Sequence, residues 1–203
     1  MDARSFDSSQ RAGARDSRII GARDRFEWGN IRYRLDVVAA NIADVVEHAG
    51  GWLFDRASAG WEVSVLVDEL TDDDRPMRIL GAEVLDLKAV LDSGGSGRQP
   101  HAIAIAADVI DRDARTGEGL RLAMADGGIQ VVGWGAGWPA NAFPVDPVLH
   151  RLSAAARVFK AQALTAAGLG EDSEVPRRVD ATERLCSGMS NWPPIVADLS
   201  PLS

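Results

Sequence analysis

Aspartate side chains follow two apolar segments in the middle of this chain. Asp68 ends the segment 62–68, Asp108 ends the segment 101–108, and Asp111 comes three residues later. Carboxylates that converge at one edge of a sheet can hold Mg²⁺, which prefers oxygen ligands. Aspartate is also common in turns and helix caps for local reasons, so a solvated acidic rim fits the same residues. The pattern favours no cofactor, with Mg²⁺ bound by these three residues as the alternative.

Aromatic side chains form a second group, in segments rich in glycine and proline. Trp134, Trp138 and Phe143 lie between residues 133 and 144, and Trp192 precedes two prolines. Tryptophan is enriched in protein interfaces because it offers a large apolar area and one hydrogen-bond donor. We therefore expect a contact surface here, for a protein partner or a second copy of the chain. Packing over the core beneath loops is the alternative.

Other chemical motifs are incomplete. The glycines of 133–137 follow an apolar segment, but Pro139 and Pro144 prevent the helix that a dinucleotide site requires at that point. The three histidines and the single cysteine do not have the spacing of zinc ligands. The sequence has no Gly-x-Ser-x-Gly motif of a nucleophilic serine. The absence of an assembled motif favours a protein that is not an enzyme.

Four apolar segments are expected to form the strands that position these residues. They are near-continuous runs, which is typical of strands buried on both faces of a sheet. The first two are joined by the short acidic link 71–76, which predicts an antiparallel hairpin. The third and fourth enclose a helix over 111–126, capped by Asp113 or Thr116, so they should be parallel. The segments are 62–68, 77–81, 101–108 and 129–134.

Helical spacing of apolar residues predicts the remaining elements. One long helix is expected to end at Gly50–Gly51, because glycine readily adopts the left-handed conformation found after helices. Another is expected to start at Asp146–Pro147. The predicted helices are 31–49, a short one over 52–60, 82–91, 146–168 and a short one near 181–186. The segment 82–91 could instead continue the strand over 77–81.

Together these elements predict an α/β fold, with a mixed or mainly parallel sheet of four to five strands flanked by helices. Residues 1–25 are rich in Arg, Asp and Ser and predict a flexible arm. Residues 26–168 form the globular domain. Residues 169–203 are expected to form a linker, a short helix and an extended docking tail.

The alternation of strands and helices from Val63 to Trp134, with aspartates at strand ends, resembles the rhythm of response-regulator receiver domains. The resemblance implies an α/β regulatory domain with an acidic Mg²⁺ pocket. Receivers carry a lysine at the end of their last strand, where this chain has Gly133 and Trp134. We therefore assign phosphoryl transfer neither to Asp68 nor to Asp108.

The composition of the chain limits the classes of partner and the compartment that we expect. The net charge is −8, and the acidic excess lies outside the first 25 residues, so binding to a nucleic-acid backbone is not expected. No apolar stretch reaches the roughly 20 residues of a membrane span, so no membrane partner is expected. One cysteine and no secretory signal predict the cytoplasm. Arginine greatly outnumbers lysine, which is typical of a GC-rich bacterial genome such as an actinobacterial one.

The sequence therefore favours a non-enzymatic, cytoplasmic regulatory or scaffolding domain that acts through protein–protein contacts. The alternative is a Mg²⁺-dependent enzyme that acts on a phosphorylated small molecule at the acidic rim.

Overall fold

The fold is that of a computed structural model, which describes residues 32–94, 99–169, 179–188 and 198–202. The chain divides into two compact units, residues 1–32 and 33–203, and the fold given below is that of the second. The predicted arm over 1–25, Trp192 and part of the predicted tail lie outside the described residues.

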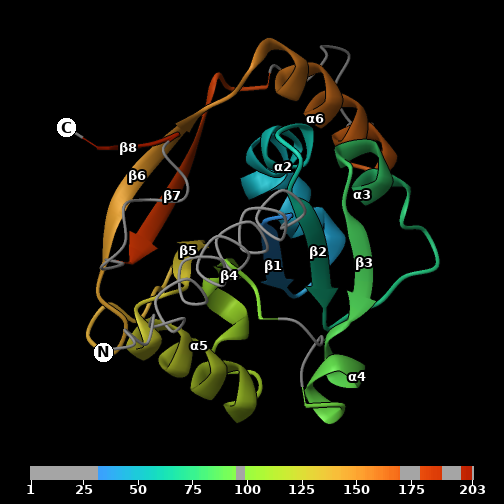
Figure 1. The fold of residues 1–203 in the computed structure, drawn as a ribbon. Helices are drawn as coiled ribbons and strands as arrows, with labels where there is room; N and C mark the ends of the chain where they lie inside the picture. Colours follow the sequence, from blue (N-terminus) through green and yellow to red (C-terminus); the bar gives the residue numbers. More distant parts are fainter. Residues whose placement is uncertain (1–31, 95–98, 170–178, 189–197, 203) are drawn as a thin grey trace, which may run out of the picture. The chain divides into compact units, whose positions relative to one another are not determined.

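A single mixed sheet organises the second unit (Figure 1). Five strands, in the spatial order β3-β2-β1-β4-β5, are parallel, and β7, β6 and β8 continue the sheet in antiparallel pairing. The described residues thus form eight strands, so the mixed α/β sheet is confirmed and the number of four to five is wrong. The strands are β1 Arg34–Ala39, β2 Glu62–Val67, β3 Glu83–Asp86, β4 Ala102–Ala106, β5 Gln130–Trp134, β6 Val145–Arg151, β7 Thr182–Gly188 and β8 Leu199–Pro201.

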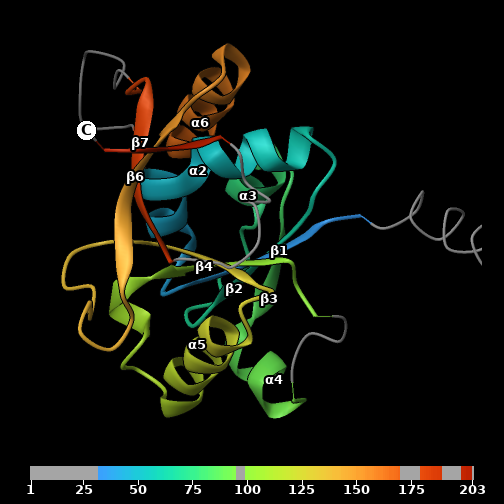
Figure 2. The same cartoon turned by 60° about the vertical axis from the view of Figure 1, so that its left-hand side comes forward.

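Helices cover both faces of the parallel strands (Figures 1 and 2). Helices α2, α3 and α6 lie on one face, and α4 and α5 lie on the other. Consecutive parallel neighbours require crossover connections, and α2, α3 and α5 supply them. The helices are α2 Ile42–Ser58, α3 Arg75–Leu80, α4 Leu87–Asp92, α5 Ala114–Asp126 and α6 Ala154–Ala166, with a 3-10 turn η1 at Ala107–Val109.

The core explains why the strands read as unbroken apolar runs. Leu35 and Val37 of β1 are fully buried, and so are Trp52 and Leu53 of α2. Successive strand side chains point to opposite faces. Because helices cover both faces, a strand here needs apolar residues at nearly every position.

The predicted helix over 31–49 is wrong at its start. Its first half is β1, and α2 begins only after Asn41, whose side chain accepts a hydrogen bond from the Asp44 amide at 3.0 Å. A strand buried on both faces is apolar at nearly every position, so some of its apolar residues also fall at helical spacing. The predicted end at Gly50–Gly51 and the separate short helix over 52–60 are also wrong, because α2 continues to Ser58.

Four further predictions are corrected by tertiary context. The segment 77–81 is not a strand but lies in α3, so β2 and β3 form a parallel crossover and not a hairpin. The segment 82–91, for which a helix was favoured over a continued strand, is β3 followed by α4. The predicted helix over 146–168 is β6 followed by α6, which Ser153 caps. The segment 181–186 is not a helix but part of β7, because its backbone pairs with β6.

The unit over 101–134 is confirmed. Strands β4 and β5 are parallel, and α5 joins them. Asp113 caps α5 by accepting a hydrogen bond from the Arg115 amide at 2.8 Å.

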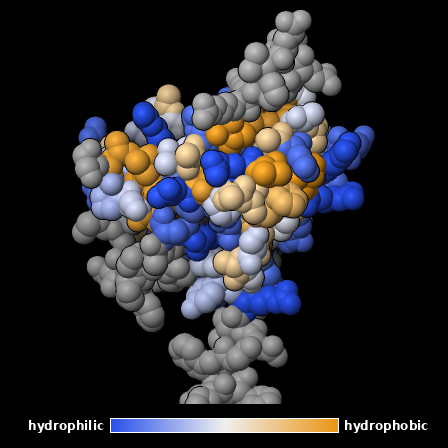
Figure 3. Space-filling model, turned by 90° about the horizontal axis from the view of Figure 1, so that it is seen from above, coloured by the Kyte–Doolittle hydropathy of each residue, from blue (hydrophilic) through white to orange (hydrophobic). Residues whose placement is uncertain are grey.

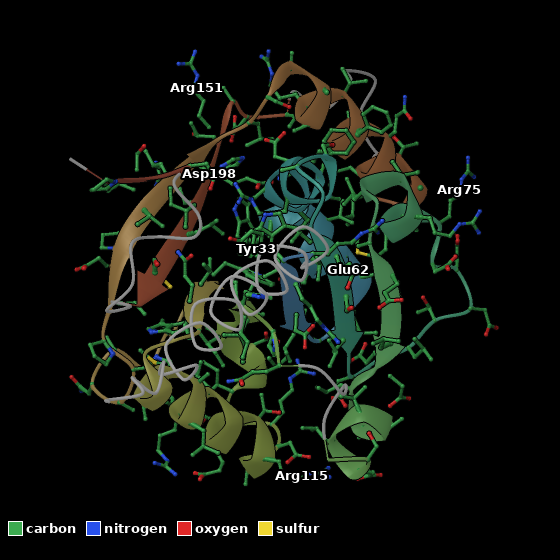
Figure 4. All side chains as sticks on the ribbon, viewed as in Figure 1. Tyr33, Glu62, Arg75, Arg115, Arg151 and Asp198 are labelled. Atoms are coloured by element: carbon green, nitrogen blue, oxygen red, sulfur yellow. The ribbon has the colours of Figure 1, made fainter. Side chains whose placement is uncertain are left out.

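A buried histidine joins the end of the described chain to the body of this unit. His150 of β6 is 3% exposed, and its Nε2 lies 2.9 Å from Asp55 Oδ2 of α2. Its Nδ1 lies 2.8 Å from Asp198 Oδ2, and Arg56 Nη2 lies 2.6 Å from the same oxygen. Figure 4 shows Asp198 between the outer strands and α2. The imidazole thus lies between two carboxylates and anchors the segment that leads into β8.

This arrangement predicts a pH-dependent stability. Burial lowers the pKa of His150, but contacts with Asp198 and Asp55 outweigh it and raise that pKa above its ordinary value of 6.5. The stabilisation is therefore complete below pH 6.5 and is lost as the pH rises through the raised value. We expect His150→Gln to cost about 1.5–3 kcal/mol at pH 6, and less at pH 9. Urea unfolding at both pH values measures this, and an equal loss at both would contradict it.

Candidate active site at the carboxyl edge of the parallel strands

The carboxyl ends of the parallel strands meet at one edge of the sheet. The chain passes from β1 to β2 on one side, whereas β4 pairs with β1 on the other. This reversal of direction is where open α/β sheets usually bind their ligands. The residues that follow β1, β2, β4 and β5 are therefore the candidates for function.

Asp44 and His48 form a pair on the first two turns of α2, directly after β1. His48 Nδ1 lies 3.1 Å from Asp44 Oδ1 and 3.1 Å from the Asp44 carbonyl oxygen. Trp134, at the end of β5, donates its indole Nε1–H to Asp44 Oδ2 at 2.9 Å. The carboxylate is thus held by side chains from two elements that are far apart in sequence.

The pair shifts the pKa of both of its members. Burial raises the pKa of Asp44, but the hydrogen bonds from His48 and Trp134 outweigh it and lower that pKa below its ordinary value. The hydrogen bond to Asp44 raises the pKa of His48 above its ordinary value. Asp44 therefore stays ionised near neutral pH, and His48 titrates at a higher pH than a free histidine.

His48 also lines a cavity of about 590 Å³ between α2, α6 and the start of β7, called here the α2–α6 cavity. A cavity of this size can hold a small molecule. Its walls are mainly polar. They are formed by Glu47, His48, Lys160, Leu164 and residues 179–184.

A buried ion pair forms part of the wall of this cavity. Lys160 Nζ lies 2.5 Å from Glu183 Oε1 and donates a second hydrogen bond to the Glu47 carbonyl oxygen at 2.7 Å. Glu183 also accepts hydrogen bonds from the backbone amides of Gly51 and Trp52, each at 2.8 Å. The pair thus fixes the middle of α2 against α6 and β7.

The acidic rim that the sequence predicts is only partly assembled. Asp68 and Asp108 converge on the guanidinium of Arg112, whose nitrogens lie 3.8 Å from Asp68 Oδ2 and 2.8 Å from Asp108 Oδ2. Lys88 Nζ lies 3.5 Å from Asp68 Oδ1. Asp111 lies on an exposed turn. Within the described ranges no three His, Cys, Asp or Glu side chains are placed to hold a metal ion. The Mg²⁺ site therefore stays a prediction, in which the ion would compete with Arg112 and Lys88 for Asp68 and Asp108.

The aromatic group behaves mainly as packing. Trp134 is 2% exposed, so its side chain is not part of a surface. Trp138 and Phe143 are partly buried against the core, and Trp138 Nε1 donates to the Phe143 carbonyl oxygen at 2.8 Å. Trp192 lies outside the described residues. Contact with a protein partner or a second copy stays a prediction. The face seen from above mixes hydrophobic and hydrophilic side chains (Figure 3).

The sequence contained a signal for the Asp44–His48 pair that our interpretation of its motifs did not use. Residues four apart on a helix are neighbours, so the spacing of Asp44 and His48 predicts their contact once α2 is known. Neither the contact with Trp134 nor the α2–α6 cavity has a local signal. Burial raises the pKa of the Cys186 thiol to about 11, which disfavours the reactive thiolate form.

Comparison with known proteins shows the fold. No protein-family model matches the chain, and no curated protein matches its sequence. Among solved structures, an antimicrobial pseudoaglycone deacetylase has a TM-score of 0.55 at 14% identity, covering 80% of this chain and 100% of its own. A deacetylase mutant from the teicoplanin biosynthetic pathway has a TM-score of 0.54 at 13% identity, covering 76% and 97%. The 4-carboxy-2-hydroxymuconate hydratase of Pseudomonas putida has a TM-score of 0.51 at 15% identity, covering 83% and 100%.

These three proteins are enzymes, and this contradicts our prediction of a non-enzymatic regulatory or scaffolding domain. That prediction assumed that catalytic residues would appear as a local motif, whereas an active site is assembled in space. At these identities the likeness establishes an α/β fold that enzymes use. In addition, no helix among the described residues is long and apolar enough to cross a membrane. The cytoplasmic location stays a prediction.

Proposed function

We propose that this protein is an enzyme that activates water through the Asp44–His48 pair and acts on a small polar molecule in the α2–α6 cavity. The observation that carries the proposal is the position of His48, which contacts an ionised carboxylate and lines a cavity. The shared fold supports it, because a deacetylase uses water to release an acetyl group and a hydratase adds water to its substrate.

The chemistry assigned to His48 is that of a general base. Both polar contacts that the ring makes among the described residues involve Nδ1. With the proton of the neutral ring on Nδ1, Nε2 carries the lone pair that can take a proton from water. Asp44 fixes this tautomer and stabilises the imidazolium that forms, and Trp134 holds Asp44 in place.

The proposal predicts a pH profile. A general base must be neutral to accept a proton, so activity should rise as the pH passes through the pKa of His48. Because Asp44 raises that pKa, the rise should centre above 6.5. Asp44→Asn should lower the rate and move the rise to lower pH.

The test uses the full chain with two probes of water-dependent acyl transfer, 4-nitrophenyl acetate and N-acetylglucosamine, with acetate release as the readout. General acid–base catalysis contributes about 10²–10⁴-fold to rates. We therefore expect His48→Gln to lower kcat by at least about 10²-fold. Glu62→Gln is the control, because Glu62 is exposed at the opposite, amino end of β2.

Two results would count against the proposal. Full activity in His48→Gln would remove the assigned base, and no acetate release from either probe by the unaltered protein would contradict hydrolysis of acetyl groups at this site. An equal loss in Glu62→Gln would show that the assay reports folding and not chemistry.

A further inference from the structure

A second cavity lies on the face of the sheet that α4 and α5 cover, away from the Asp44–His48 pair. It has a volume of about 300 Å³ and is lined by residues of these two helices and of β1, β2 and β4. Strand side chains that point away from α2 form its floor. Apart from Pro100, the apolar residues that line it have branched aliphatic side chains: Val38, Leu66, Leu87, Val90, Leu91, Ile103, Ile105 and Leu120.

The charged groups around this cavity are already paired. Arg34 Nε donates to Asp36 Oδ1 at 2.8 Å at the floor. At the rim, Arg115 of α5 donates to Asp92 at 2.7 Å and to Asp113 at 2.8 Å. Figure 4 shows Arg115 at the gap between α5 and α4. An ionic ligand would have to break these pairs, so an uncharged molecule fits the site better.

One polar group in the lining has no such partner. Thr116 is 7% exposed, and its Oγ1 has no hydrogen-bond partner among the described residues. A buried hydroxyl without a partner costs free energy. A ligand with one hydroxyl or carbonyl group could supply the missing hydrogen bond.

Gly119 lines the cavity from the exposed side of α5. It lies inside α5, where glycine is less favourable than alanine, and it lines the cavity. A Cβ built on Gly119 would meet no atom within 4 Å, so no close neighbour requires glycine there. A larger side chain at this position would take up space at the edge of the cavity.

We propose that this cavity is a binding site for a small, uncharged, largely hydrocarbon molecule with one polar group, such as a medium-chain alcohol. Aliphatic walls remove its hydrocarbon part from water, which is the main driving force for such binding. Thr116 receives the polar end. The site is separate from the α2–α6 cavity and does not depend on the function proposed above.

The test is a fluorescence titration of the full chain with 1-aminoanthracene, followed by displacement with 1-octanol. Two substitutions at one position provide a matched pair. Gly119→Ala adds one methyl group and should leave the Kd of the dye within about twofold, whereas Gly119→Leu should raise it at least tenfold. Val90→Trp fills the cavity from α4 and should raise it likewise. Circular dichroism confirms that each variant is folded, and His48→Gln should bind the dye as the unaltered chain does.

Three results would overturn the proposal. They are no fluorescence increase with the unaltered chain, no displacement by 1-octanol, and equal affinity in Gly119→Ala, Gly119→Leu and Val90→Trp. The first would also result if another segment of the chain fills the cavity.

Discussion

Glu183→Leu should lower the free energy of unfolding by about 3–5 kcal/mol, because it leaves the Lys160 ammonium buried without its counter-charge. Leucine is similar in size to glutamate, so lost packing contributes little. Lys160 and Glu183 are 7% and 4% exposed, so most of the surface of each side chain is out of contact with water. The amides of Gly51 and Trp52 lose an acceptor at the same time.

Urea unfolding followed by circular dichroism measures this loss. The double variant Lys160→Met/Glu183→Leu should recover part of it, because replacing both members of a buried ion pair by apolar residues removes the unpaired charge. The control is Glu118→Ala, since Glu118 pairs with Arg121 on the exposed side of α5 and exposed pairs contribute little. A loss in the double variant as large as in Glu183→Leu would show that the charge is not the cause.

Gly133→Ala should destabilise the protein by about 1–3 kcal/mol, the usual cost of overpacking a core. A Cβ built on Gly133 of β5 would lie 2.1 Å from Cζ3 of the Trp138 ring. The indole cannot move freely, because its Nε1 donates to the Phe143 carbonyl oxygen. Relief of the clash therefore requires the loop that follows β5 to shift.

Thermal unfolding measures this effect, and tryptophan fluorescence should report a changed environment of Trp138. Gly119→Ala is the matched control, because a Cβ there meets no atom within 4 Å and alanine favours a helix by up to about 1 kcal/mol. If Gly133→Ala is as stable as Gly119→Ala, the close contact between Trp138 and β5 is not a constraint.

The carboxylates at the carboxyl edge of the parallel strands have different partners. Asp68 and Asp108 were the residues that the sequence favoured, and they do lie at the carboxyl edge of parallel strands. The structure pairs both with Arg112 and places Lys88 beside Asp68, so both carboxylates already have cationic partners. Asp44 instead has a histidine partner that lines a cavity, and this is why we assign the chemistry to that pair.

Local sequence determined the unit from β4 to β5. Its two apolar runs, the Asp113 cap and the glycine after α5 all act within a few residues, so the parallel crossover could be predicted. The mixed α/β class was predictable for the same reason, because burial on both faces leaves unbroken apolar runs.

Tertiary structure alone decided the rest. The segment 31–49 contains a strand and a helix that share one apolar spacing, and only pairing with β2 and β4 fixes the strand. The segment 181–186 is a strand because β6 offers it hydrogen bonds, whatever its own propensity. The candidate site joins Asp44 to Trp134, which lies 90 residues away. No local sequence pattern predicts such a contact, because it results from the spatial order of the strands in the sheet.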